Sequence, residues 1–227
     1  MKLTTQEARY LRLHAQGLAG PRLRTVSAVV ERLVGVQAQE EAAARLAIRP
    51  RSTGLTAAGV EQARVDERTI VHTWAMRGTL HLVSAAELGW LLPLLGPHFV
   101  RGGRRRRKQL GIDGKIGRTA MRAIRELLGA EGALTRAELT TRLAARGIPT
   151  DGQAIYHLIG RAALEGILCA GAPRDSERTY ALLDQWAPVT STGEGEEQVA
   201  RLAHRYLQGY GPVTVEDFAH WSGLPLR

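Results

Sequence analysis

Two glutamines, Gln37 and Gln39, stand on either side of one small residue in the stretch "GVQAQEEAA". We expect residues 36–39 to be extended, so that positions i and i+2 project to the same side. Each carboxamide has donor hydrogens and an acceptor oxygen, so the pair can hold and orient a water molecule, although neither can take up a full proton. That suits hydrolysis of a bond whose leaving group needs no protonation, such as the N-glycosidic bond of an alkylated, cationic base. On residue types alone, a polar linker into the next helix is the simpler interpretation.

The elements that must position this pair are helices and one hairpin. An amphipathic helix over 25–34, ending at Gly35, is predicted from the spacing of Val26, Val29, Val30, Leu33 and Val34. Residues 69–83, "TIVHTWAMRGTLHLV", are rich in β-branched and aromatic side chains and predict a hairpin that turns at "RGT". With a helix over 5–16, they predict a first winged helix in which residues 40–66 form an inserted helical connection.

The hairpin carries further polar side chains. His72 and His81 fall on its opposite arms, but no nearby cysteine or acid completes a ligand set, so a metal site is disfavoured. We expect the side chains near the turn to approach DNA, namely Arg77, Thr79 and His81.

Four segments have the Ser/Thr-x-x-acid pattern that caps the start of a helix. They begin at Thr4, Ser84, Thr135 and Thr214.

Residues 133–183 predict a second winged helix. A helix that stops at Gly147 is followed by the linker "PTDG" and by a second helix with one apolar stripe. The opposite side of that helix carries Gln153, His157 and Arg161, the pattern of a helix that reads DNA. The segment "GILCAGAPRDSERTYALLD" then predicts two short strands around a polar turn, which would be the wing.

The predicted fold is therefore mainly α-helical with short β-hairpins, in the α+β class, and consists of tandem winged helices. We expect an N-terminal domain over 1–127, a second winged helix over 128–190 and the start of a third over 191–227. The third unit has one predicted helix after Thr214, so we expect it to be incomplete in this sequence.

The net charge of +9 favours a polyanionic partner, and double-stranded DNA is the leading candidate. The basic run "RGGRRRRKQLGIDGK" should be solvated and mobile and should contact phosphates. Its basic side chains are Arg104, Arg105, Arg106, Arg107 and Lys108.

Several classes of protein are excluded or disfavoured. The lysines are Lys2, Lys108 and Lys115, all in polar or basic stretches, which disfavours a Schiff-base enzyme. The single cysteine, Cys169, rules out an internal disulfide or a cysteine-based zinc site. No segment predicts a signal peptide or a membrane span, so we expect a cytoplasmic location.

Three stretches, "VGVQAQ", "WAMRGTLHLV" and "GPVTVEDFAHWSGLP", together resemble the bacterial winged-helix DNA glycosylases of the AlkZ type, which include azinomycin self-resistance proteins and YcaQ-like enzymes. The resemblance implies that Gln37 and Gln39 are the catalytic Gln-x-Gln pair of that family. It also implies removal of N-alkylated purines and unhooking of interstrand cross-links, without a lyase step. We expect no cofactor. The partner would be alkylated or cross-linked duplex DNA.

A second hypothesis is a winged-helix DNA-binding protein or transcription regulator without catalytic activity. It requires selective binding of an intact duplex through Gln153 and Arg161.

Overall fold

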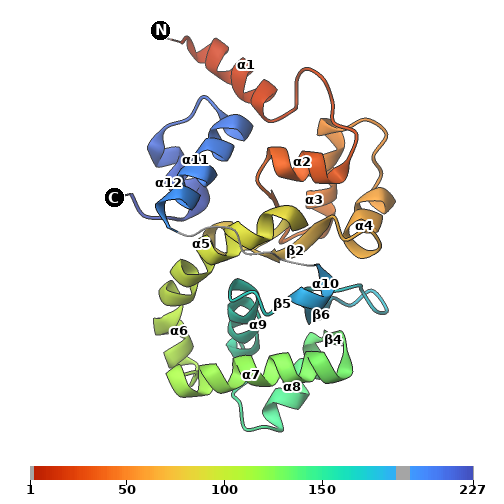
Figure 1. The fold of residues 1–227 in the computed structure, drawn as a ribbon, viewed down its shortest axis with the longest axis vertical. Coiled ribbons are helices and arrows are strands. Elements are labelled where there is room, and N and C mark those ends of the chain that lie inside the picture. Colours follow the sequence, from red (N-terminus) through yellow and green to blue (C-terminus); the bar gives the residue numbers. More distant parts are fainter. Residues whose placement is uncertain (1–2, 188–194, 227) are drawn as a thin grey trace.

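The computed structural model describes residues 3–187 and 195–226, which form helices around two small antiparallel sheets (Figure 1). The sheets have equivalent strand orders, β1-β3-β2 and β4-β6-β5. Each sheet belongs to a unit with the same order along the chain, namely helix, strand, two helices and two strands, which is the order of a winged helix. The predicted fold class is confirmed.

The first unit is built differently from the prediction. It consists of α2 (Val26–Arg32), β1 (Val36–Gln37), α3 (Glu41–Ile48), α4 (Ala57–Val65), β2 (Ile70–Trp74) and β3 (Leu80–Ser84). Residues 40–66 are therefore the helix-turn-helix itself, and the expectation of an inserted connection is wrong. The helix α1 (Thr5–Ala15) has no buried residue, so it cannot supply the core of this unit.

The second unit follows the predicted order of helix, turn, helix and wing. It contains α7 (Gly114–Glu131), β4 (Leu134–Thr135), α8 (Arg136–Ala144), α9 (Ala154–Leu164), β5 (Leu168–Ala170) and β6 (Thr179–Leu182). One apolar cluster joins α7 to α8, α9 and the strands. We therefore propose that this unit begins near Ile112 and not at residue 128.

The two units are joined by α5 (Leu88–Gly102) and α6 (Arg104–Gln109), which descend along one side of Figure 1 to α7. Gly96 of α5 lies against the backbone carbonyl of Leu164 at the end of α9, where no larger residue would fit. This contact brings α9 close to the hairpin. The basic run forms α6, so the prediction that it is mobile is wrong.

The C-terminal helices lie beside the first unit, on the other side from α4 (Figure 1). The 3₁₀ turns η1 (Arg49–Arg51), η2 (Met76–Gly78) and η3 (Ala85–Glu87) and the helices α10 (Leu183–Trp186), α11 (Glu196–Tyr210) and α12 (Val215–Ser222) complete the described elements. α1 packs on α11, and α12 packs on η2. Of the predicted third unit, residues 191–194 and 227 lie outside the described residues. No helix in the described part of the chain is long and apolar enough to cross a membrane.

Three of the four predicted helix caps are present as full capping boxes, at Thr4, Thr135 and Thr214. Ser84 is the exception. It is buried, and its hydroxyl donates to the Glu31 carboxylate at 2.9 Å instead of capping a helix. A local pattern fails here because a partner from a distant helix competes for the same hydroxyl.

Candidate active site

Gln37 and Gln39 project to the same side of the chain, as expected. Both are exposed, whereas Ala38 between them is buried. The amide Nε2 of Gln37 donates to Oε1 of Gln39 at 2.5 Å. The two carboxamides therefore form one hydrogen-bonded pair at the surface.

Both backbone polar groups of Ala38 are hydrogen-bonded. The N–H of Ala38 donates to the carbonyl of Leu80 at 2.8 Å. The carbonyl of Ala38 accepts a hydrogen bond from Nε2 of His72 at 3.0 Å. With Ala38 fixed inward in this way, the alternation of an extended chain places the glutamines on either side of it outward.

The two histidines of the hairpin are buried and uncharged near neutral pH. Burial lowers the pKa of His72 to about 4, and the positive charge of Arg178 adds to the effect. Burial also lowers the pKa of His81 to about 4. His81 pairs with Gln37 across β1 and β3, and its Nδ1–H donates to the carbonyl of Thr79 at 2.9 Å. Only 2% of His81 is exposed, so the expectation that it contacts DNA is wrong.

The histidines also lie on opposite faces of the sheet, because His72 pairs with Leu82 whereas His81 pairs with Thr73. Among residues 3–187 and 195–226, no three His, Cys, Asp or Glu side chains are grouped as a metal site would require. Cys169 is buried, and burial raises the pKa of its thiol to about 12.

Arg77, at the turn of the hairpin, contacts the glutamine pair directly. Its Nη2 donates to Oε1 of Gln37 at 2.8 Å, and its Nη1 donates to the carbonyl of Trp221 at 2.7 Å. Thr79 is half-buried, and its hydroxyl donates to the carbonyl of Met76 at 3.1 Å. The guanidinium of Arg77 is thus bound within the protein, and the DNA contacts predicted for Arg77 and Thr79 stay predictions.

Two open cavities flank the pair. One, of about 480 Å³, is lined by Gln37, Gln39, Glu40, Arg51 and Tyr210, among others. The other, of about 540 Å³, is lined by Gln39, by Trp74 and Arg77 of the hairpin region, by Phe99 and Arg107, and by the α9 side chains Tyr156, His157 and Arg161. Gln39 therefore lies on the ridge between them.

The polar side of α9 faces this second cavity and the start of α6. Gln153 accepts a hydrogen bond from Arg106 at 2.8 Å. Arg161 is paired with Glu165 at 2.7 Å, with 14% of its side chain exposed. Burial, followed by the charges of Arg107 and Arg106, lowers the pKa of His157. Gln153 and Arg161 thus each have a partner within the protein, whereas His157 lines the open cavity, and the DNA contact predicted for all three stays a prediction.

The basic run divides into two groups. Arg107 is buried, and its guanidinium donates to the carbonyl of Val100, so it is not available to phosphates. The other four side chains are exposed on α6, namely Arg104, Arg105, Arg106 and Lys108. The first of them, Arg104, directly follows Gly103, which lines the second cavity together with Arg107.

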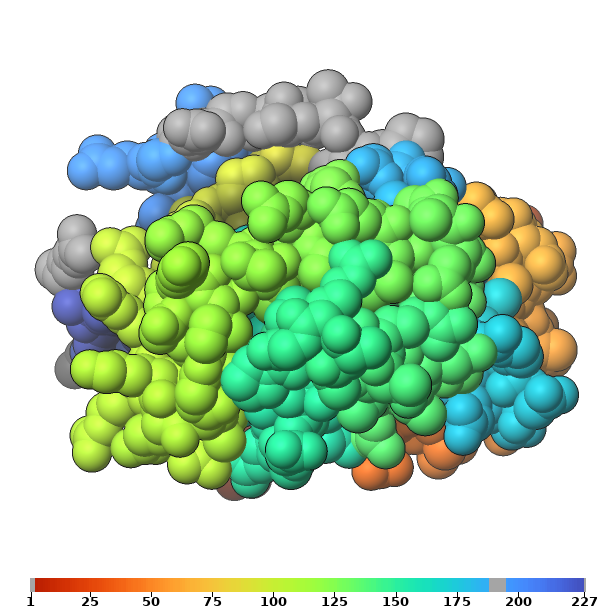
Figure 2. Space-filling model, turned by 90° about the horizontal axis from the view of Figure 1, so that it is seen from below, coloured from red at the N-terminus to blue at the C-terminus, as the bar shows by residue number. Residues whose placement is uncertain are grey.

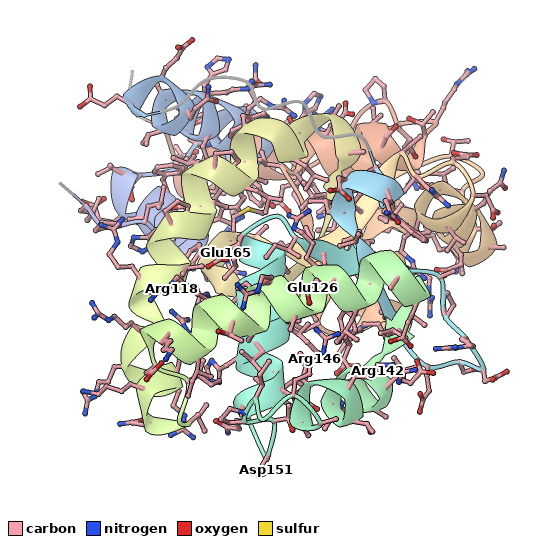
Figure 3. All side chains as sticks on the ribbon, turned by 60° about the horizontal axis from the view of Figure 1, so that its bottom comes forward. Arg118, Glu126, Arg142, Arg146, Asp151 and Glu165 are labelled. Carbon is pink, nitrogen blue, oxygen red and sulfur yellow. The ribbon has the colours of Figure 1, made fainter. Side chains whose placement is uncertain are left out.

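The outer face of the second unit is formed mainly by α6 to α9, and the first unit is visible only at its edge (Figure 2). Ion pairs join α7 to α8 and to the turn after it: Glu131 pairs with Arg142 of α8 at 2.6 Å, and Glu126 pairs with Arg146 beyond the end of α8 at 2.9 Å. Figure 3 labels Glu126, Arg142 and Arg146. These two pairs each cancel one basic charge within the protein. The exposed basic side chains of α6 form no ion pair in the described part of the chain, so their charge is open to a polyanion.

Comparisons with known proteins give the family of this chain. The family model described as DNA glycosylase AlkZ-like matches residues 30–227. The chain belongs to the AlkZ-like DNA glycosylase family. An interstrand DNA cross-link repair glycosylase of Streptomyces sahachiroi is 31% identical over 242 residues, covering 99% of this chain and 62% of the relative.

The solved structure of the Streptomyces sahachiroi DNA glycosylase AlkZ superposes with a TM-score of 0.84 at 27% identity. The match covers 98% of this AlkZ-like chain and 61% of that one. The chain thus spans about three fifths of the length of the relatives it matches.

Two features of this AlkZ-like site had not been identified from the sequence. One is the hydrogen bond from His72 to the backbone between the glutamines. The other is Glu40, whose exposed carboxylate lines the cavity beside both amides. The only available signal was adjacency, because Glu40 directly follows Gln39.

Proposed function

We propose that this chain is a monofunctional DNA glycosylase that removes N-alkylated purines and unhooks interstrand cross-links, in which Gln37 and Gln39 hold the attacking water. The observation that carries the proposal is the exposed amide pair, of which Gln37 lines one cavity and Gln39 lies on the ridge between that cavity and a second one. Family membership supports the reaction type, and the name of the Streptomyces sahachiroi relative supports the class of lesion.

The hydrogen bonds leave suitable groups free on the pair. The Gln37 oxygen accepts from Arg77, and the Gln39 oxygen accepts from Gln37, so each keeps one lone-pair site. A water that donates one proton to each oxygen has its own lone pair directed away from the protein. Such a water can attack a carbon but cannot lose a proton to either amide.

Because neither amide can accept a proton, the pair suits a substrate whose leaving group departs without being protonated. In an N7-alkylated purine nucleotide the C1′–N bond breaks with its electron pair going to the cationic base, which leaves as a neutral molecule. The sugar becomes an oxocarbenium ion, the water oxygen bonds to C1′, and one proton is released afterwards. No general acid is needed, and the proton can pass to solvent or to the Glu40 carboxylate in the same cavity.

We propose duplex DNA as the partner, with the exposed basic side chains of α6 contacting phosphates. The open cavities on both sides of Gln39 would accept a bulky lesion without burying it. The transcription-regulator hypothesis is weaker, because Gln153 and Arg161, on which it depends, bind Arg106 and Glu165.

The test is an assay of the full chain on duplexes that contain N7-methylguanine or a defined interstrand cross-link. We expect release of the free modified base and formation of alkali-labile abasic sites. Unmodified duplex, incubated in parallel, is the control. Binding of the duplexes without base release would contradict the proposal and would favour a DNA-binding protein.

A further inference from the structure

Arg77 has an unusual backbone conformation for a residue with a long side chain. Its φ is 56°, in the left-handed region, which is unfavourable for a residue with a Cβ atom. Gly78 follows with φ 64°, and its N–H donates to the carbonyl of Ala75 at 2.9 Å. The turn thus keeps a strained residue at the position whose guanidinium reaches Gln37.

The guanidinium joins the pair to a distant helix. The carbonyl of Trp221 accepts from its Nη1 at 2.7 Å and lies in the last turn of α12. Carbonyls in that turn lack a helical partner, and the C-terminal end of a helix carries partial negative charge. Both effects hold the cation in place, even though residues 77 and 221 are 144 positions apart.

The same guanidinium determines the orientation of the amides. Because it can only donate, Gln37 must present its oxygen to Arg77 and its NH₂ group to Gln39. Gln39 then presents its oxygen to Gln37. Without this contact, the Gln37 amide can rotate by about 180° and offer water a donor where the pair now offers an acceptor.

We infer that Arg77 is the positioning residue that orders the Gln37–Gln39 pair, and that α12 acts on the site through it. The inference rests on the proposed function, since it assigns Arg77 a role in that reaction. A lysine would keep the charge at position 77, but its compact ammonium lacks the planar fork that reaches two acceptors in fixed directions.

Gly223 offers a second position at which the contact between Arg77 and Trp221 can be changed by mutation. It ends α12 with φ 76°, and a side-chain carbon there would lie 3.0 Å from Cα of Arg77 and 3.0 Å from the Phe99 ring. The absent side chain is what lets the end of α12 lie on the turn. Gly223→Ala should therefore displace Trp221 from Arg77 without altering either glutamine.

The test is single-turnover base release at saturating protein, with duplex affinity measured separately. We expect Arg77→Ala and Arg77→Lys each to slow release by about 10–100-fold, as loss of an orienting partner commonly does, with affinity changed less than about threefold. Gly223→Ala should slow release in the same direction. The matched control is Arg122→Ala, which removes an equal charge from an exposed position on α7.

A double-mutant cycle separates positioning from DNA binding. In a Gln37→Ala background, Arg77→Ala should cause no further loss, because its effect passes through Gln37. Additive losses, weaker duplex binding with an unchanged rate, or full activity of Arg77→Lys would each overturn the inference. If Gln37→Ala itself keeps full activity, the proposed function fails instead, which is a distinguishable result.

A second readout does not need catalysis. In ¹⁵N NMR spectra, the side-chain NH₂ signals of Gln37 and Gln39 should shift in Arg77→Lys and in Gly223→Ala, and stay in place in Arg122→Ala. Unchanged signals in both variants would show that Arg77 does not order the pair.

Discussion

Replacing Gln37 and Gln39 together by alanine should lower the single-turnover rate of N7-alkylguanine release by at least about a thousandfold. The expectation follows from the loss of both acceptors that would hold the water, since removing one oriented polar group commonly costs about 10²–10³ in rate. Each single variant should lose nearly as much as the double variant, because one remaining amide cannot direct both protons of the water. Affinity for the unmodified duplex should change little, as neither side chain carries charge.

The matched control is Gln6→Ala, which truncates an exposed glutamine on α1. Gln37→Asn and Gln39→Asn retain the chemistry of the amide and shorten its reach by one methylene, and they should be almost as impaired as the alanine variants. Activity of the double alanine variant within about threefold of the unaltered protein would exclude the water-holding role.

The protein should lose about 3 kcal/mol of stability through His81 alone as the pH falls from 7.5 to 4. Burial lowers the folded-state pKa of His81 to about 4, whereas the unfolded value is near 6.5, a difference of about 2.5 units at about 1.4 kcal/mol each. Between these values the unfolded chain binds more protons, so the stabilisation is complete above pH 6.5 and is lost as the pH falls toward 4. His72 acts in the same direction.

Urea unfolding at pH 7.5, 6, 5 and 4 measures this loss. His81→Gln should show a shallower decline with falling pH, whereas His204→Gln, at an exposed position, should follow the unaltered protein. Equal slopes for all three proteins would contradict the burial of an uncharged His81. Since both histidines adjoin the glutamine strand, base release should fall over the same pH range.

Patterns that depend on neighbours in the sequence predicted the structure well. The capping boxes at Thr135 and Thr214, the hairpin and the wing each need only residues within a few positions. The shared side of Gln37 and Gln39 also followed from local geometry, because an extended tripeptide has one alternation whatever surrounds it.

Features that depend on distant partners were not predictable. The segment of α4 has a weak apolar pattern, because its buried residues are Val60, Ala63 and Arg64, so its place as the third helix of the first unit was not evident. The basic run forms a helix because Arg107 folds back over Gly103 to the Val100 carbonyl. No spacing rule indicates that Arg77 would bind Gln37, 40 positions away, and Trp221.

A crystal structure of the chain bound to a duplex that carries a cationic azasugar, as a stable mimic of the oxocarbenium ion, would test the role of the amide pair. We predict one ordered water within about 3 Å of both glutamine oxygens, on the side of the anomeric position, with Arg77 still bound to Gln37. An azasugar held away from the ridge between the two cavities, with no water bridging the amides, would contradict it.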